Sequence, residues 1–178
     1  MTARDLLAGY PDARTGERVV YYDAGMLIAL LDEDRRARTT HETLKASPHR
    51  PVITGPVLVQ VWRDGPATAH ALGEVAGDCT ILQAKDDIGP IRGLERGVIG
   101  CLPCHRVYRR ADFQRAGRML GKARLPPKKK PDAVDALVMV AAAWHSPSLI
   151  LTSDPEDLLA YRAVLDTHTH QIEIVPVT

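Results

Sequence analysis

The stretch that decides the fold is Asp132–Asp154, DAVDALVMVAAAWHSPSLILTSD. Its first part, up to Trp144, is rich in Ala, Val, Leu and Met and begins with an acid favourable at a helix N-cap, which predicts a helix. Residues 148–152 are a short apolar run bounded by polar residues, which is typical of a buried strand. A helix leading directly into a buried strand is part of a βαβ unit, and such units build parallel sheets.

The rest of the chain repeats this alternation of short strands and helices. Val19–Tyr22 is a β-branched and aromatic run followed by an apolar helical segment. The expected strands are 19–22, 51–54, 79–82, 148–152 and 171–177, and the expected helices are 26–31, 39–46, 56–62, 67–75, 107–120, 132–144 and 155–164, with residues 86–121 mostly helical. The pattern predicts an α/β fold with a mostly parallel central sheet covered by helices on both faces.

Length and composition indicate one globular domain. The chain has 178 residues, of which 45% are hydrophobic and only 4% aromatic, so we expect a core of Val, Leu, Ile, Ala and Met. Residues 1–17 lack clear periodicity and are expected to form an N-terminal tail or arm, with the domain over residues 18–178. No apolar run approaches the roughly 20 residues needed to cross a bilayer and the first residues lack an apolar signal segment, so we expect a cytoplasmic protein without a membrane partner.

Charge is unevenly distributed along the chain although the formal net charge is only +1. Residues 92–130 carry twelve Lys or Arg and two acids, whereas residues 131–178 carry seven acids and one Arg. A basic segment next to an acidic one suggests a surface for a polyanion beside a site that attracts cations, although a solvated helix face also explains the basic segment.

Three aspartates are placed where a parallel sheet would bring them together. Asp23 follows the first strand, Asp154 follows the 148–152 strand, and Asp135 lies one turn into the helix before that strand. Strand ends of one polarity share one edge of the sheet, and converging carboxylates repel one another unless a cation neutralises them. Oxygen ligands favour Mg²⁺ or Mn²⁺. Asp132 and Asp157 would add metal-binding carboxylates, or would cap their helices.

These segments resemble the PIN-domain ribonucleases, a family that includes VapC-type toxins. The resemblance rests on VVYYDAGMLIALLD, PVLVQVWR, PDAVDALVMVAAA and LILTSDPEDL, which follow one another in the expected order. It implies a three-layer α/β/α sandwich and Mg²⁺- or Mn²⁺-dependent hydrolysis of RNA, with Asp23, Asp135 and Asp154 as catalytic, metal-binding residues. It also implies a homodimer and, for the toxin branch, a small antitoxin partner.

One position departs from the family pattern. The helix that reads VLVQVW has Gln60 where the family usually has Glu. An amide oxygen can assist metal binding or accept a hydrogen bond but brings no charge. The alternative to a ribonuclease is therefore a PIN-like RNA- or protein-binding module with weakened catalysis.

Basic residues near the acids are candidates for RNA binding. Lys128, Lys129 and Lys130 form a proline-flanked loop just before Asp132, and Arg109 and Arg110 precede it in the same basic segment. Such side chains bind backbone phosphates without reading sequence. The RNA would then reach a metal site that activates water for in-line attack on phosphorus.

Other chemistries have weaker sequence support. Cys101, Cys104 and His105 match a haem-attachment spacing without an export signal, and they lack a second half for a zinc finger, although Cys79 could join them in space. A phosphoaspartate at Asp23 would need an acid two residues later, where the chain has Gly25.

Overall fold

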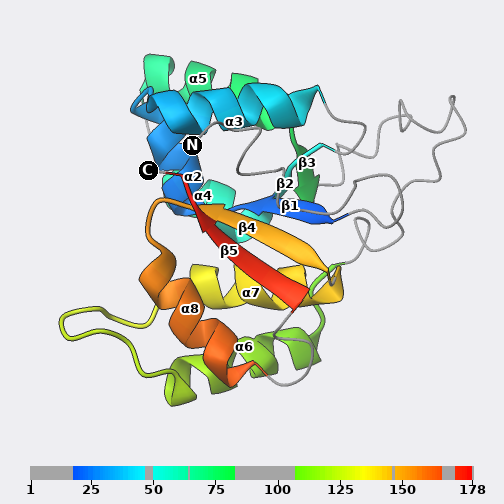
Figure 1. Ribbon diagram of the computed structural model, residues 1–178, viewed down its shortest axis with the longest axis vertical. Coiled ribbons are helices and arrows are strands. Elements are labelled where there is room, and N and C mark those ends of the chain that lie inside the picture. Colours follow the sequence, from blue (N-terminus) through cyan, green and yellow to red (C-terminus); the bar gives the residue numbers. More distant parts are fainter. Residues whose placement is uncertain are drawn as a thin grey trace, which may run out of the picture.

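The computed structural model describes residues 18–46, 50–63, 65–82, 107–145, 147–165 and 171–177. Five strands and seven helices occur in this part of the chain (Figure 1). The strands are β1 (Val19–Tyr22), β2 (Val52–Thr54), β3 (Thr80–Leu82), β4 (Ser148–Thr152) and β5 (Ile172–Pro176). The helices are α2 (Ala24–Leu31), α3 (Arg35–Lys45), α4 (Gly55–Val61), α5 (Pro66–Gly77), α6 (Arg110–Lys122), α7 (Ala133–Trp144) and α8 (Pro155–Val164).

The sheet is parallel throughout and has the strand order β3-β2-β1-β4-β5. From β1 the chain moves outward through β2 to β3, then returns to place β4 on the other side of β1. In the register, Tyr22 at the end of β1 lies between Ile53 of β2 and Leu151 of β4. The direction of strand addition therefore reverses between β1 and β4, and open α/β sheets bind ligands beyond the carboxyl ends of strands at such a reversal.

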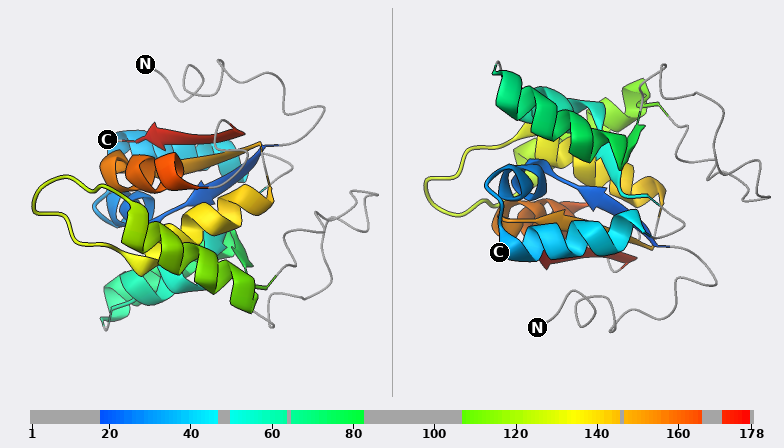
Figure 2. Two further views of the ribbon diagram at one scale, coloured as in Figure 1. Left: turned by 90° about the horizontal axis from the view of Figure 1, so that it is seen from below. Right: turned by 90° about the horizontal axis from the view of Figure 1, so that it is seen from above.

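Helices cover both faces of the sheet, which confirms the expected three-layer α/β/α sandwich. Helices α2, α3 and α5 lie on one side, and α6, α7 and α8 on the other (Figures 1 and 2). Helix α4 contacts α2 in the first layer and α7 in the second. This α4 contact brings the segment after β2 next to the start of α7.

The core is built mainly from aliphatic side chains, as expected, but it also contains Tyr21, Tyr22 and Tyr161, each fully buried. Their hydroxyl groups have polar partners. The Tyr21 hydroxyl donates to the carbonyl of Ala141 at 3.0 Å and also contacts His145, and the Tyr22 oxygen lies 3.1 Å from Nδ1 of His41. Because the hydroxyls are hydrogen-bonded, the aromatic rings can be buried without leaving an unsatisfied polar atom.

The predicted strands and helices that fall within the described residues all appear, with some boundaries shifted. Helix α3 starts at Arg35 rather than Thr39 because Asp34 caps it, accepting hydrogen bonds from the N–H groups of Arg36 and Ala37 at 2.9 Å each. The 125–131 segment is a loop, as its prolines indicate. The predicted N-terminal tail and the residues from 86 to 106 lie outside the described residues. None of the described helices has the length and apolar character needed to span a membrane.

Candidate metal centre

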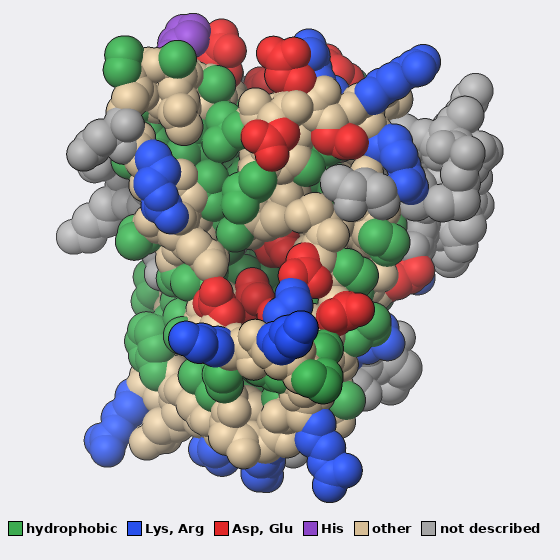
Figure 3. All heavy atoms as spheres, turned by 90° about the vertical axis from the view of Figure 1, so that its left-hand side faces the viewer, with side chains coloured by type: hydrophobic (Ala, Val, Ile, Leu, Met, Phe, Trp, Pro, Cys, Tyr) green, Lys and Arg blue, Asp and Glu red, His purple; other side chains and the backbone are tan. Residues whose placement is uncertain are grey.

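The five candidate aspartates gather at the carboxyl edge of the sheet, where the strand order reverses. Asp23 immediately follows β1 and Asp154 follows β4 by two residues. The N–H of Asp23 donates to the carbonyl of Leu151 at 3.3 Å, which holds the two strand ends side by side. Figure 3 views the molecule from this edge and shows acidic side chains around a shallow hollow, with Lys and Arg side chains along its lower border.

Asp23 is a buried acid that caps the helix following β1. It is the N-cap of α2, and its Oδ1 accepts a hydrogen bond from the N–H of Met26 at 2.7 Å. The residue is buried, with 4% of its surface exposed. Burial raises the pKa of Asp23 to about 6, against the opposing effect of a hydrogen bond from Thr152. Asp23 is therefore a carboxylate held in place by its own helix but poorly stabilised as an anion.

Asp135 lies in the first turn of α7, among carboxylates and without capping duties. Among the described residues, the Asp135 side chain has no hydrogen bond or ion pair, unlike those of Asp132 and Asp154. Burial, followed by repulsion from Asp132, Asp23, Asp157 and Asp154, raises its pKa to about 7. These electrostatic interactions place all five aspartates in one neighbourhood, and a bound cation would relieve their repulsion.

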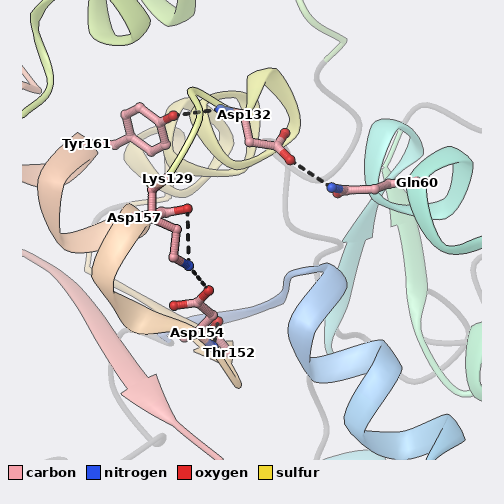
Figure 4. Close-up of polar contacts among 7 residues, drawn as sticks. All are labelled: Gln60, Lys129, Asp132, Thr152, Asp154, Asp157 and Tyr161. Atoms are coloured by element: carbon pink, nitrogen blue, oxygen red, sulfur yellow. Dashed lines mark hydrogen bonds and ion pairs between the residues drawn. The ribbon is translucent and has the colours of Figure 1, made fainter. Parts of the chain in front are cut away.

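Asp132 links three structural elements at the N-terminus of α7. As the N-cap, its Oδ1 accepts from the N–H of Val134 at 2.7 Å, while its Oδ2 accepts from Nε2 of Gln60 in α4 at 2.8 Å (Figure 4). Its own N–H donates to the hydroxyl oxygen of Tyr161 in α8 at 2.8 Å. Asp132 therefore caps its helix, which is one of the two roles that the sequence allowed. It also fixes α4 and α8 relative to α7.

Asp154 and Asp157 share a lysine. Nζ of Lys129 contacts Oδ2 of Asp154 and lies 3.6 Å from Oδ2 of Asp157 (Figure 4). Asp154 occupies the N-cap position of α8 but its side chain makes no capping hydrogen bond, and more than half of the side chain is exposed. Asp157 is buried in the first turn of α8, and burial raises its pKa while Lys129 lowers it. The site therefore carries one internal positive charge.

The donor chemistry fits a hard divalent cation. All candidate ligands are oxygen atoms. Two buried oxygens at the site, Oε1 of Gln60 and Oδ1 of Asp157, have no hydrogen-bond partner among the described residues. However, within the described residues no three His, Cys, Asp or Glu side chains are grouped closely enough to hold a metal ion. The acids surround a common region without forming a ligand cage, and the cation among them is Lys129.

The basic residues predicted to bind RNA divide into two groups. Lys128 and Lys130 are exposed in the loop between α6 and α7, close to the acids. Arg109 and Arg110 are at the opposite end of α6, where the neighbouring Asp112 accepts a hydrogen bond from Nε1 of Trp144, the last residue of α7. Since α7 has 12 residues and rises about 1.5 Å per residue, these arginines lie roughly 18 Å from the acids. The structure does not bring them to the candidate centre.

Sequence reasoning did not single out Thr152 or Tyr161, and it treated Lys129 like its two neighbours. Tyr161 follows Asp157 by four residues on α8, so the helical period places both on one face and could have identified it. Thr152 is the last residue of β4, and this position at the strand end could have identified it. The inward direction of Lys129 has no sequence signal. Cys101, Cys104 and His105 lie outside the described residues, while Cys79 is a buried free thiol.

A separate cavity of about 670 Å³ lies between α3 and α5, away from the acids. Its charged lining is paired internally. Nζ of Lys45 lies 2.8 Å from Glu42 and 3.7 Å from Asp78, and Nε2 of His41 lies 3.5 Å from the same Asp78 carboxylate. This cavity has no group of unneutralised like charges, so the acidic edge of the sheet is the better candidate site.

No family model matches the chain, and neither a curated protein nor a solved structure shows a significant similarity to it.

Proposed function

We propose that this protein is a Mg²⁺- or Mn²⁺-dependent ribonuclease of the PIN-domain type. The observation that carries the proposal is the convergence of Asp23, Asp135 and Asp154 at the strand-order reversal, with Asp132 and Asp157 beside them. Helix capping explains why an acid stands at position 132 and contributes to the explanation of Asp23. It explains neither the presence of Asp135 nor the unpartnered oxygen of Asp157 among the described residues. Lys129 supplies one positive charge against these five carboxylates, so the group is costly without a further cation to bind.

In this proposal the aspartates hold the ion and the exposed lysines hold the RNA. A divalent ion supplies the Lewis acidity that makes water nucleophilic and offsets the charge that develops on the phosphate. Asp23 is fixed by β1 and its hydrogen bond to Met26, so its carboxylate keeps one orientation. Asp135 projects from the first turn of α7, whose N-cap is tied to Gln60 and Tyr161. Lys128 and Lys130 bind backbone phosphates at the border of the site.

Cleavage of labelled single-stranded RNA tests the proposal. We expect cleavage with Mn²⁺ or Mg²⁺, none with a chelator, and a loss of about 100-fold or more in Asp23→Asn and Asp135→Asn. Asp34→Asn, which changes an N-cap aspartate on α3, is the matched control and should cleave like the native chain. Equal cleavage by all four preparations would indicate a contaminating nuclease and would count against the proposal.

A second candidate function is an RNA- or protein-binding module with weakened catalysis, and Gln60 favours it. The amide donates to Asp132 and contributes no negative charge to the site. Metal-independent binding of single-stranded RNA without cleavage, unchanged in Asp23→Asn, would select this alternative.

The resemblance extends the nuclease proposal to a toxin with a homodimeric form and an antitoxin partner. Growth arrest on expression, relieved by Asp135→Asn, tests the toxin role.

A further inference from the structure

Of three consecutive lysines in the loop between α6 and α7, Lys129 alone is turned toward the acids. Its side chain is only 32% exposed, whereas Lys128 and Lys130 are both exposed. Its ammonium group contacts the Asp154 carboxylate and lies 3.6 Å from that of Asp157 (Figure 4). The sequence predicted three equivalent phosphate-binding lysines in this loop. One of them, Lys129, instead forms ion pairs within the protein.

The backbone of the loop turns immediately before Lys129. Lys128 has a φ of 81°, in the left-handed region that a residue with a side chain rarely adopts. The N–H of Lys129 donates to the carbonyl of Pro126 at 3.1 Å, which closes a turn. The loop projects from the same edge of the molecule as the acids (Figures 1 and 2). The strained residue thus comes immediately before the lysine that turns inward.

The Lys129 ammonium uses the atoms that a divalent ion would need. Asp154 is one of the three proposed metal-binding residues, and its Oδ2 is the atom that Lys129 contacts. Oδ2 of Asp157 faces the same ammonium, while Oδ1 of Asp157 is buried and has no hydrogen-bond partner in the part of the chain that the structure describes. A divalent ion that binds these carboxylates would find one oxygen already in contact with the ammonium. It would also be repelled by the ammonium's positive charge.

We propose that Lys129 is a tethered cation that occupies the place of the divalent ion on Asp154 and Asp157 and thereby weakens metal binding. The inference rests on the proposed metal-dependent function, because it assigns Lys129 a role at the same site. Metal binding requires the Lys129 side chain to leave Asp154, and the exposed loop gives it room to do so. Lys129 is in this sense a positioning residue that sets metal affinity and not a ligand.

The test is a calorimetric titration of the metal-free chain, residues 1–178, with Mn²⁺ alone. The proteins compared are the native chain, Lys129→Gln, Lys129→Met, Lys130→Gln and Asp135→Asn. Removing the ammonium should tighten Mn²⁺ binding by about fivefold or more in both Lys129 variants, the scale of a partly exposed ion pair. Lys130→Gln removes the same charge one residue away, and solvent screening should keep its affinity within about twofold of the native value.

Three outcomes separate the two proposals. Tighter binding in the Lys129 variants alone supports the tethered cation, and Lys129→Met, which keeps most of the aliphatic stem, checks that the effect follows the charge and not the packing. Equal affinity in the native chain and the Lys129 variants, with loss in Asp135→Asn, overturns the tethered cation and leaves the metal site standing. No Mn²⁺ binding by any of the proteins overturns both. Thermal unfolding without metal shows whether each variant is folded.

Discussion

Nε2 of Gln60 donates a hydrogen bond to Oδ2 of Asp132 across 2.8 Å, joining two residues 72 positions apart in the chain. This contact ties α4 to the N-terminus of α7 and leaves Oε1 of Gln60 buried, with no hydrogen-bond partner in the described residues. The neutral amide thus stabilises one carboxylate of the site by donating to it. A second carboxylate at this position would instead repel Asp132.

Gln60→Glu should therefore lower the stability of the metal-free protein and raise its affinity for Mn²⁺. Without metal, the lost hydrogen bond and the added repulsion should lower the free energy of unfolding by about 1–3 kcal/mol. With saturating Mn²⁺ much of this loss should be recovered. Thermal unfolding with and without Mn²⁺ measures both effects, and Gln60→Ala, which loses the hydrogen bond without adding charge, is the control. A metal-independent loss of the same size in both variants would contradict the prediction.

The raised pKa values of Asp23 and Asp135 predict an unusual dependence of stability on pH. Their pKa values are about 6 and about 7 in the folded chain, against an ordinary value of 3.8. Between about pH 4 and about pH 7 the folded, metal-free protein binds more protons than the unfolded chain. The free energy of unfolding should therefore fall as the pH rises from about 4 to about 7. Mn²⁺ affinity should rise over the same range, because protons compete for the carboxylates.

Asp135→Asn tests which group is responsible for this pH dependence. The variant removes a half-buried carboxylate that lies among four others, so it should stabilise the metal-free protein above about pH 7 by about 1–2 kcal/mol, after discounting for solvent screening. Below about pH 4 both proteins are neutral at this position and should be equally stable. Urea unfolding of both proteins at a series of pH values measures the difference. A variant that is less stable at every pH would show that Asp135 has a structural partner.

Gly25 sets the spacing between the Asp23 and Asp154 segments. A Cβ atom there would lie 2.6 Å from Oγ and 2.9 Å from the backbone N of Ser153. The Ser153 side chain can rotate away but its backbone cannot, so Gly25→Ala should cost about 1–2 kcal/mol of stability and should widen the site. Gly117→Ala is the matched control, because no atom lies within 4 Å of the added Cβ in α6. That control should be neutral or stabilising by up to about 1 kcal/mol. Denaturant unfolding of both variants decides the comparison.

Much of the fold was predictable because its signals are local. The run from Val19 to Tyr22 and the run from Ser148 to Thr152 are both short, apolar and followed by polar residues, which is enough to identify buried strands. The meeting of Asp23 with Asp154 then follows from a general property of parallel sheets, whose carboxyl ends share an edge. Asp135 follows from helical geometry, because it lies three residues after the N-cap Asp132.

The features that were not predictable depend on contacts between distant segments. Arg109 and Lys128 belong to one basic stretch of sequence, yet α6 separates them and carries the arginine to the far end of α7. Lys129 turns toward the acids directly after the left-handed backbone of Lys128, and a lysine gives no sequence signal for that conformation. The buried tyrosines escaped a prediction based on composition, since their burial requires specific hydroxyl partners such as the Ala141 carbonyl.

The separation of the two basic groups makes the route of the RNA testable. Binding of labelled single-stranded poly(U) in the presence of a chelator, measured over a range of salt concentrations, reports how many phosphate contacts are made. Each lysine that contacts a phosphate contributes about 0.7 to the slope of log affinity against log salt. Replacing Lys128 and Lys130 with alanine should therefore reduce the slope by about 1.4, and adding Lys129→Ala should reduce it little further, because that ammonium contacts Asp154.

The Arg109→Ala and Arg110→Ala double variant is the comparison for this experiment. It removes the same number of positive charges from the opposite end of α6, where the sequence predicted RNA binding but the described residues form no acidic cluster. If the RNA backbone lies only along the border of the acids, this variant should keep the native slope. A reduced slope in the arginine variant with an unchanged slope in the lysine variant would move the RNA path to the far end of α6. Equal reductions would require a path along the whole helix, for which the exposed Arg118 near its middle is the next residue to replace.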